Sequence, residues 1–145
     1  MKVSTRSRYG LKALLEIATA EENKCVSLQA ISDKSGISVN YLEQIIATLK
    51  KAGIVKSIRG AKGGYVIGKK LEDISLGEVI RVLEGDLMPV SCIDNNLDCV
   101  EDTECSCGNK CTSGCLTKDA WIKVYSVITE SIDGISIRDI VEKNL

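Results

Sequence analysis

The chain has 145 residues, 44% of them hydrophobic, which suits one domain with a core and is too many for a disordered chain. No apolar run is long enough to cross a bilayer, and the N-terminus lacks the apolar stretch of a signal peptide, so we expect a cytoplasmic protein. The net charge of -1 averages two opposite parts: residues 1–70 carry thirteen Lys and Arg against five Asp and Glu, a net charge of +8, whereas residues 71–145 carry -9. This polarity favours a basic end that binds an anionic polymer over two ordinary solvated faces.

The first half of the chain predicts three helices, from apolar spacing and from residues that cap helix ends. Apolar residues recur at helical spacing over 7–20. Ser27 is placed to cap a short helix over 28–34, and Ser38 is placed to cap a longer helix over 39–52. A short turn with a glycine joins these last two helices, which is typical of a helix-turn-helix but also of an ordinary helical hairpin.

The residues that follow distinguish these two alternatives. Residues 54–58 alternate apolar and polar side chains like a strand, 59–64 form a basic glycine-rich turn, and 65–68 form a return strand. A glycine-rich loop that binds a nucleotide would instead lie between a strand and a helix. We therefore expect a β-hairpin wing directly after the helix-turn-helix.

The helix over 39–52 and the wing carry side chains suited to DNA. Once the apolar stripe of the helix is buried, its other face exposes Asn40, Glu43 and Gln44, which can pair with the edges of adenine or cytosine. Lysines near the helix end and in the wing suit phosphates, and Arg59 at the wing tip suits a narrow minor groove. The candidate DNA-binding residues are Ser38, Asn40, Tyr41, Glu43, Gln44, Lys51, Lys56, Arg59 and Lys62.

The second half of the chain predicts a helix over 75–84, a long helix over 117–133, and a last helix over 137–143 that opens with a capping box. The long helix has more apolar side chains than a chain of this size covers easily. A homodimer explains the excess, because palindromic DNA sites need a two-fold protein; packing against its own winged helix is the alternative. The fold class is thus mainly α with a small β-hairpin wing. It divides into a winged helix-turn-helix DNA-binding domain over 1–85, a cysteine-rich loop over 86–116, and a dimerisation helix with a C-terminal helix over 117–145.

Cysteine use indicates a bound metal. Six of the seven cysteines lie within 24 residues, and the chain contains no histidine. Without an export signal, such density favours metal binding over disulfides, and thiolates bind zinc or iron–sulfur clusters. The spacing lacks the paired CxxC pattern, which weakens the structural-zinc interpretation. Cys25 stands alone in a turn and is interpreted as a small packing residue.

Four segments resemble the IscR-type family of bacterial winged-helix transcription regulators: 4–10, 37–44, 55–65 and 74–80. The resemblance covers nearly the whole chain, and the segments of the longer helix and the wing are specific. It implies a dimer with a long crossed dimerisation helix and an iron–sulfur cluster of the [2Fe–2S] type, held by three cysteines in the loop before that helix. It also implies repression of the genes for cluster assembly when the cluster is bound.

The same resemblance implies Cys92, Cys107 and Cys115 as the cluster ligands. Cys92 follows the helix after the wing, and Cys115 lies six residues before Trp121, as in the family. Some relatives place a histidine where this chain has Lys118, so the fourth ligand is open between a further cysteine, a carboxylate and a residue of the partner chain. The middle ligand is open among Cys99, Cys105, Cys107 and Cys111, of which we predict Cys107.

The sequence therefore predicts a DNA-binding transcription regulator with an iron–sulfur sensor. A thiol–disulfide or nitric-oxide sensor on the same winged helix is one alternative, and an adaptor that binds protein is another. A small cysteine-based redox enzyme is disfavoured, because the chain shows no nucleotide-binding motif, histidine or paired catalytic carboxylate. We expect an operator in double-stranded DNA and a second copy of the chain as partners, and neither a membrane nor a small-molecule substrate.

Overall fold

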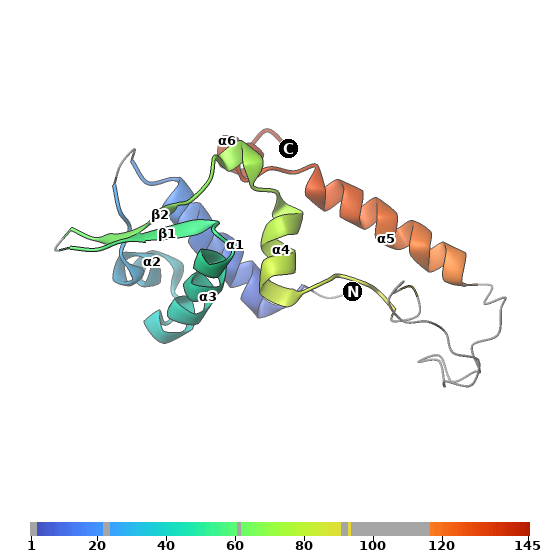
Figure 1. The fold of residues 1–145 in the computed structure, drawn as a ribbon, viewed down its shortest axis with the longest axis horizontal. Coiled ribbons are helices and arrows are strands. Elements are labelled where there is room, and N and C mark those ends of the chain that lie inside the picture. The colour runs from blue at the N-terminus through green and yellow to red at the C-terminus, as the bar shows by residue number, and fades with distance from the viewer. Residues whose placement is uncertain (1–2, 22–23, 61, 91–92, 94–116) are drawn as a thin grey trace. The chain divides into compact units, whose positions relative to one another are not determined.

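The computed structural model describes residues 3–21, 24–60, 62–90, 93 and 117–145, and these belong to two compact units (Figure 1). The winged-helix body comprises residues 2–85 together with 132–145, and the second unit comprises residues 86–131. The structure thus groups the C-terminal residues with the DNA-binding part of the chain, whereas the sequence placed them with the dimerisation helix. Among the described helices, none is long and apolar enough to cross a membrane.

Three helices open the body: α1 (Thr5–Ala18), α2 (Leu28–Ser35) and α3 (Val39–Lys51). Helix α1 begins two residues earlier than expected, because the Ser4 hydroxyl accepts hydrogen bonds from the first backbone N–H groups. The Ser27 hydroxyl caps α2 as predicted, accepting from the N–H of Ala30 at 3.1 Å. Ser38 is the N-cap residue of α3 as predicted, although its side chain makes no capping hydrogen bond.

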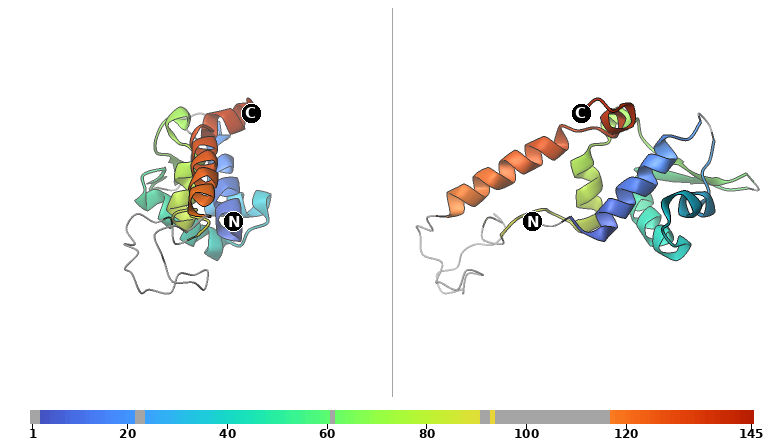
Figure 2. Two further views of the ribbon diagram at one scale, coloured as in Figure 1. Left: turned by 90° about the vertical axis from the view of Figure 1, so that its right-hand side faces the viewer. Right: turned by 180° about the vertical axis from the view of Figure 1, so that it is seen from behind.

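The wing is an antiparallel hairpin of β1 (Val55–Ile58) and β2 (Gly64–Ile67). It extends beyond the three helices (Figure 2). At its base, Val26 pairs with Tyr65 through two backbone hydrogen bonds of 3.0 and 2.8 Å. A side chain on Gly64 would press on this pairing, since its Cβ would lie 2.7 Å from the Val26 carbonyl oxygen. The segment before α2 is therefore held against the edge of the wing.

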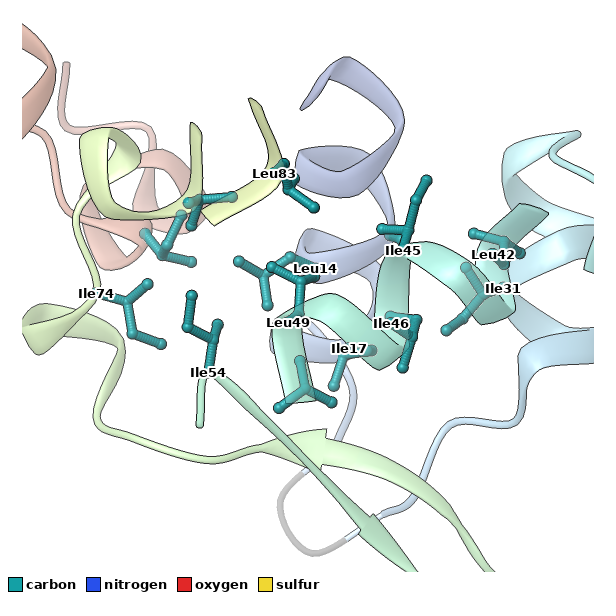
Figure 3. Close-up of a cluster of buried hydrophobic side chains, with 14 of the residues drawn as sticks. Leu14, Ile17, Ile31, Leu42, Ile45, Ile46, Leu49, Ile54, Ile74 and Leu83 are labelled. Atoms are coloured by element: carbon teal, nitrogen blue, oxygen red, sulfur yellow. The ribbon is translucent and has the colours of Figure 1, made fainter. Parts of the chain in front are cut away.

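The core of the body is aliphatic and is shared by every helix of the unit (Figure 3). Leu14 of α1, Ile31 of α2 and Leu49 of α3 are completely buried. Helix α4 (Leu76–Glu84), capped by the Ser75 hydroxyl, adds its own apolar face to the same cluster. Helices α1 and α4 approach so closely that a side chain on Gly10 would collide with the Leu83 side chain. This packing fixes the positions of α3 and the wing.

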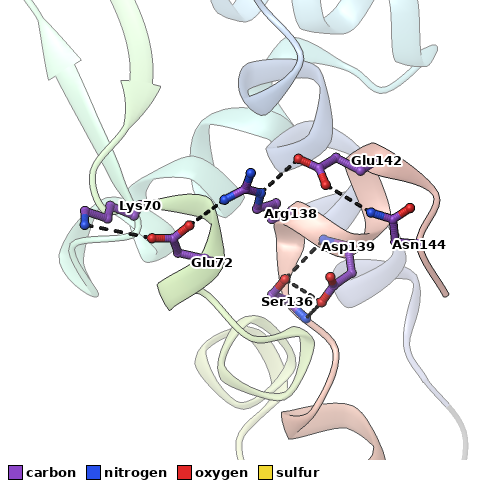
Figure 4. Close-up of polar contacts among 7 residues, drawn as sticks. All are labelled: Lys70, Glu72, Ser136, Arg138, Asp139, Glu142 and Asn144. Atoms are coloured by element: carbon purple, nitrogen blue, oxygen red, sulfur yellow. Dashed lines mark hydrogen bonds and ion pairs between the residues drawn. The ribbon is translucent and has the colours of Figure 1, made fainter.

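The end of the chain closes the body through α6 (Ile137–Glu142). Ile137 is completely buried, and its N–H donates to the carbonyl of Ile74 at 2.8 Å. The predicted capping box of Ser136 and Asp139 is present, with both reciprocal hydrogen bonds (Figure 4). The pKa of Asp139 is lowered, chiefly by the hydrogen bond from the Ser136 side chain.

Arg138 adds ion pairs to Glu72 at 2.7 Å and to Glu142 at 2.8 Å. The pKa of Arg138 is raised by these two carboxylates, Glu142 first.

The second unit contains the long helix α5 (Lys118–Asp133), whose last two residues belong to the body. None of its side chains is buried in the chain as described. Four of its large apolar residues are 39 to 51% exposed, and its Tyr125 hydroxyl donates to Asp86 at 2.6 Å. The exposed apolar residues of α5 are Trp121, Ile122, Val124 and Val127.

Candidate DNA interface

Helix α3 has one buried face and one free face. Its apolar stripe is buried in the core, as the helical spacing of these residues requires. On the opposite face Asn40, Glu43 and Gln44 are exposed, together with Ala47 and Lys51. The amide and carboxylate groups on this face are the kind that hydrogen-bond to base edges in a major groove.

Tyr41 is less free than its position in the sequence indicated. Its ring is half-buried against the core and meets the ring of Tyr9 edge-on, with the two ring centres 6.1 Å apart. This edge-to-face packing is a favoured aromatic geometry and joins the first turn of α3 to α1. Ser38, immediately before α3, is exposed.

The start of α1 carries two arginines that sequence reasoning did not assign to the interface. The Arg6 guanidinium donates to the Thr48 hydroxyl of α3 at 3.0 Å, and Arg8, two residues further along α1, is exposed and donates to the Thr5 hydroxyl. No described carboxylate forms an ion pair with either arginine. The run of arginines in the sequence could have marked them, but the contact with Thr48 joins residues 42 positions apart and depends on the packing of α1 against α3.

A carboxylate on α4 fixes this end of α1. The backbone N–H of Ser4 donates to the Glu84 carboxylate at 2.9 Å. Desolvation alone would raise the pKa of Glu84, but the hydrogen bonds to its carboxylate, among them the one from the Ser4 N–H, outweigh this effect and lower it. The arginine-bearing turn therefore begins from an anchored position.

The wing carries the remaining cations. Lys56, Arg59 and Lys62 are all exposed, and within the described part of the chain none of them forms an ion pair with a carboxylate. Gly60, beside Arg59, has a φ of 130°, a conformation that side chains rarely adopt, so the turn at the tip needs a glycine there. Together with α3 and the start of α1, the wing gives the body an unneutralised basic surface.

The predicted cluster ligands Cys92, Cys107 and Cys115 lie outside the described residues. Cys25 is described and is half-buried in the segment paired with the wing. Among the described residues, no group of three or more Cys, Asp or Glu side chains is arranged to hold a metal ion. The three other cysteines of the loop also lie outside the described residues: Cys99, Cys105 and Cys111.

The helix-turn-helix, its wing and their basic surface define a winged-helix DNA-binding protein. The family model of Rrf2, described as an iron-dependent transcriptional regulator, matches residues 3–143. The chain belongs to the Rrf2 family and is therefore a DNA-binding transcription regulator. The Rrf2 family is a family of transcription regulators and not of enzymes. The predicted resemblance to IscR-type regulators is confirmed at this level.

Relatives with two different names are equally similar to the chain. The HTH-type transcriptional regulator CymR of Bacillus subtilis is 36% identical over 140 residues, which cover 97% of this chain and 89% of that protein. The HTH-type transcriptional regulator IscR of Aliivibrio salmonicida is 36% identical over 146 residues, covering 99% of this chain and 79% of that protein. The solved structure of T. potens IscR, 36% identical, superposes with a TM-score of 0.76 and covers 100% of this chain and 89% of its own. Identity therefore establishes the fold and the family and favours neither kind of regulator.

Proposed function

We propose that the protein is an iron–sulfur-dependent transcription regulator that binds its operator as a homodimer and represses genes for cluster assembly. The observation that carries this proposal is the placement of six cysteines between α4 and α5, in a chain of this family without any histidine. A plain winged-helix regulator has no need of that many thiols at one place.

DNA reading is assigned to α3 and the wing. Asn40, Glu43 and Gln44 are exposed on one face of α3 and would contact base edges in the major groove. Ser38 and Tyr41 lie at the start of the same helix, where Tyr41 positions the helix through its contact with Tyr9. The cations that would contact phosphates or the minor groove are Lys51, Lys56, Arg59 and Lys62.

Dimerisation is assigned to α5. Four of its large apolar residues are at least 39% exposed, and exposed apolar patches on a helix mark interaction sites. A second copy of the chain is the natural partner, because a two-fold dimer places two recognition helices about 34 to 36 Å apart, one DNA turn. The helix supplies the contacts between protomers, and each body supplies one recognition helix.

The cluster is assigned to Cys92, Cys107 and Cys115, with a fourth ligand from the remaining donors of the chain or its partner. Thiolates are the ligands that iron–sulfur clusters take in proteins. When bound, such a group would connect the end of the segment after α4 to the segment before α5. Loss of the cluster would then remove this connection between the part of the chain that reads DNA and the part that forms the dimer.

Anaerobic purification tests this proposal. We expect an absorption spectrum of an iron–sulfur cluster together with matched iron and acid-labile sulfide, and the loss of both in Cys92→Ala and in Cys115→Ala. Cys25→Ala is the matched control and should keep both, because Cys25 packs beside the wing. Protein that contains no iron but forms a disulfide reversibly among the loop cysteines would instead support a thiol sensor and refute the cluster.

A further inference from the structure

A cleft of about 620 Å³ opens beside the wing of the winged-helix body. Four segments line it: the end of α1, the segment before α2, one side of α2, and the tip of the wing. The volume lies within the range of small-molecule sites, about 300 to 1,000 Å³. Small residues from three of these segments, Ala20, Ala30 and Gly63, leave the space open.

The residues that line the cleft are hydrogen-bonded to the wing or belong to it. Val26 lines the cleft and forms both backbone hydrogen bonds to Tyr65 of β2. Lys62 and Gly63 of the wing turn line it from the other side. A molecule in the cleft would therefore contact the wing and the segment that holds its base at the same time.

The lining carries charges of both signs. Lys34 pairs with Glu16 at 3.2 Å, and Lys24 pairs with Glu21 at 3.3 Å. Both lysines are well exposed, and ion pairs of this kind contribute about 0 to 1 kcal/mol, so a ligand can exchange with them at little cost. Lys62 forms no ion pair with any described carboxylate, which leaves one cation of the lining available.

We propose that this cleft binds a small zwitterion of the α-amino acid class and that binding weakens the affinity for the operator. The ligand carboxylate is placed at Lys62 and Lys24, and its ammonium group at Glu16 or Glu21. Lys62 would otherwise contact a DNA phosphate. A bound ligand therefore removes one cation from the DNA interface and changes the position of the wing relative to the DNA. Only this effect on DNA rests on the proposed function; ligand binding itself does not.

Calorimetric titration of the full-length protein with each of the L-amino acids tests the site. Succinate and inorganic phosphate serve as anion-only probes, and putrescine serves as a cation-only probe. We expect saturable binding of at least one amino acid and of none of these three probes. Ala30→Met fills the cleft and should abolish that binding while leaving operator affinity without ligand unchanged. Gln29→Met, on the neighbouring residue that does not line the cleft, should bind as the unchanged protein does.

Operator affinity measured with and without the bound amino acid completes the test. We expect about tenfold weaker DNA binding, which is in the usual range of coupling between two sites, and no such change in Ala30→Met. Phosphate or succinate binding as tightly as any amino acid would make the cleft a seat for a DNA phosphate and overturn the proposal. Absence of amino acid binding at millimolar concentration would overturn it as well, even if operator binding is normal.

Discussion

The winged-helix body and helix α5 of the second unit differ in how far their apolar side chains are buried. In the body, apolar side chains from α1, α2, α3, α4 and α6 meet in one cluster, and many of them are completely buried. In α5, Trp121, Ile122, Val124 and Val127 remain 39 to 51% exposed. The body buries its apolar core within one chain, whereas α5 has an exposed apolar surface that we assign to contact with a second copy. Substitutions in the body should therefore lower the free energy of unfolding, whereas substitutions on α5 should weaken association of the dimer.

The largest effect is expected in the core of the body. Leu49→Ala removes a completely buried side chain of α3 and should lower the free energy of unfolding by about 2 to 5 kcal/mol. Val124→Ala on α5 should lower the unfolding free energy of the separated monomer by much less, because Val124 is 42% exposed. Urea unfolding at low protein concentration measures both. Equal losses would contradict the distinction between the two regions.

A second substitution tests the assignment of α5 to dimerisation. Ile122→Asp places a charge on an apolar surface that the dimer would bury, and it should weaken association by about 2 kcal/mol or more. Glu130→Gln, on an exposed residue of the same helix, is the control and should leave association unchanged. Sedimentation equilibrium reports the dissociation constant. A variant at Ile122 that remains as tightly dimeric as the control would refute the role of this helix face.

Within the body, reading and positioning of DNA should separate. Gln44→Ala should cost about 1 to 3 kcal/mol on the cognate operator and little on random DNA, because the exposed amide would read a base. Lys56→Ala should weaken binding to both DNAs about equally, as expected for a phosphate contact. Fluorescence anisotropy on both duplexes measures the difference. Two variants with the same profile would show that these roles are wrongly assigned.

The smallest effect concerns the arginines at the start of α1. If each subunit makes about four phosphate contacts, a plot of the logarithm of the DNA-binding constant against the logarithm of the salt concentration should have a slope of about -7 for the dimer. Arg6→Gln should reduce the magnitude of this slope by about 2, one contact per subunit, if Arg6 reaches the backbone from its position beside Thr48. Arg138→Gln, whose side chain is paired with Glu72 and Glu142, should leave the slope unchanged. Equal slopes for the Arg6 variant and the unchanged protein would remove α1 from the interface.

How far the sequence anticipated the structure depends on the range of the interactions involved. The elements of the body were predictable because local signals agree: Ser27 caps α2, the apolar stripe of α3 repeats at helical spacing, and turn residues flank both strands of the wing. Ser38 is the N-cap residue of α3 as predicted, but the missing side-chain hydrogen bond was not predictable, because a serine before a helix permits this bond without requiring it.

Features that depend on contacts between distant segments were not predictable. The approach of Arg6 to Thr48 and the cleft beside the wing both arise from packing among several elements. The middle cluster ligand stays a prediction for a different reason: the cysteine spacing is irregular, so position along the chain does not single out Cys107 from its neighbours.

We propose that the cluster couples the two regions: by connecting the segment after α4 to the segment before α5, it would set how the two recognition helices of the dimer are spaced and therefore which operators fit. This coupling is tested by operator affinity at fixed salt, measured anaerobically on one preparation before and after iron is removed with a chelator. We predict that removal of iron changes the ratio of affinities for two operators of different half-site spacing by about fivefold or more, while the dimer persists. Identical affinities and identical preference before and after iron removal would contradict it.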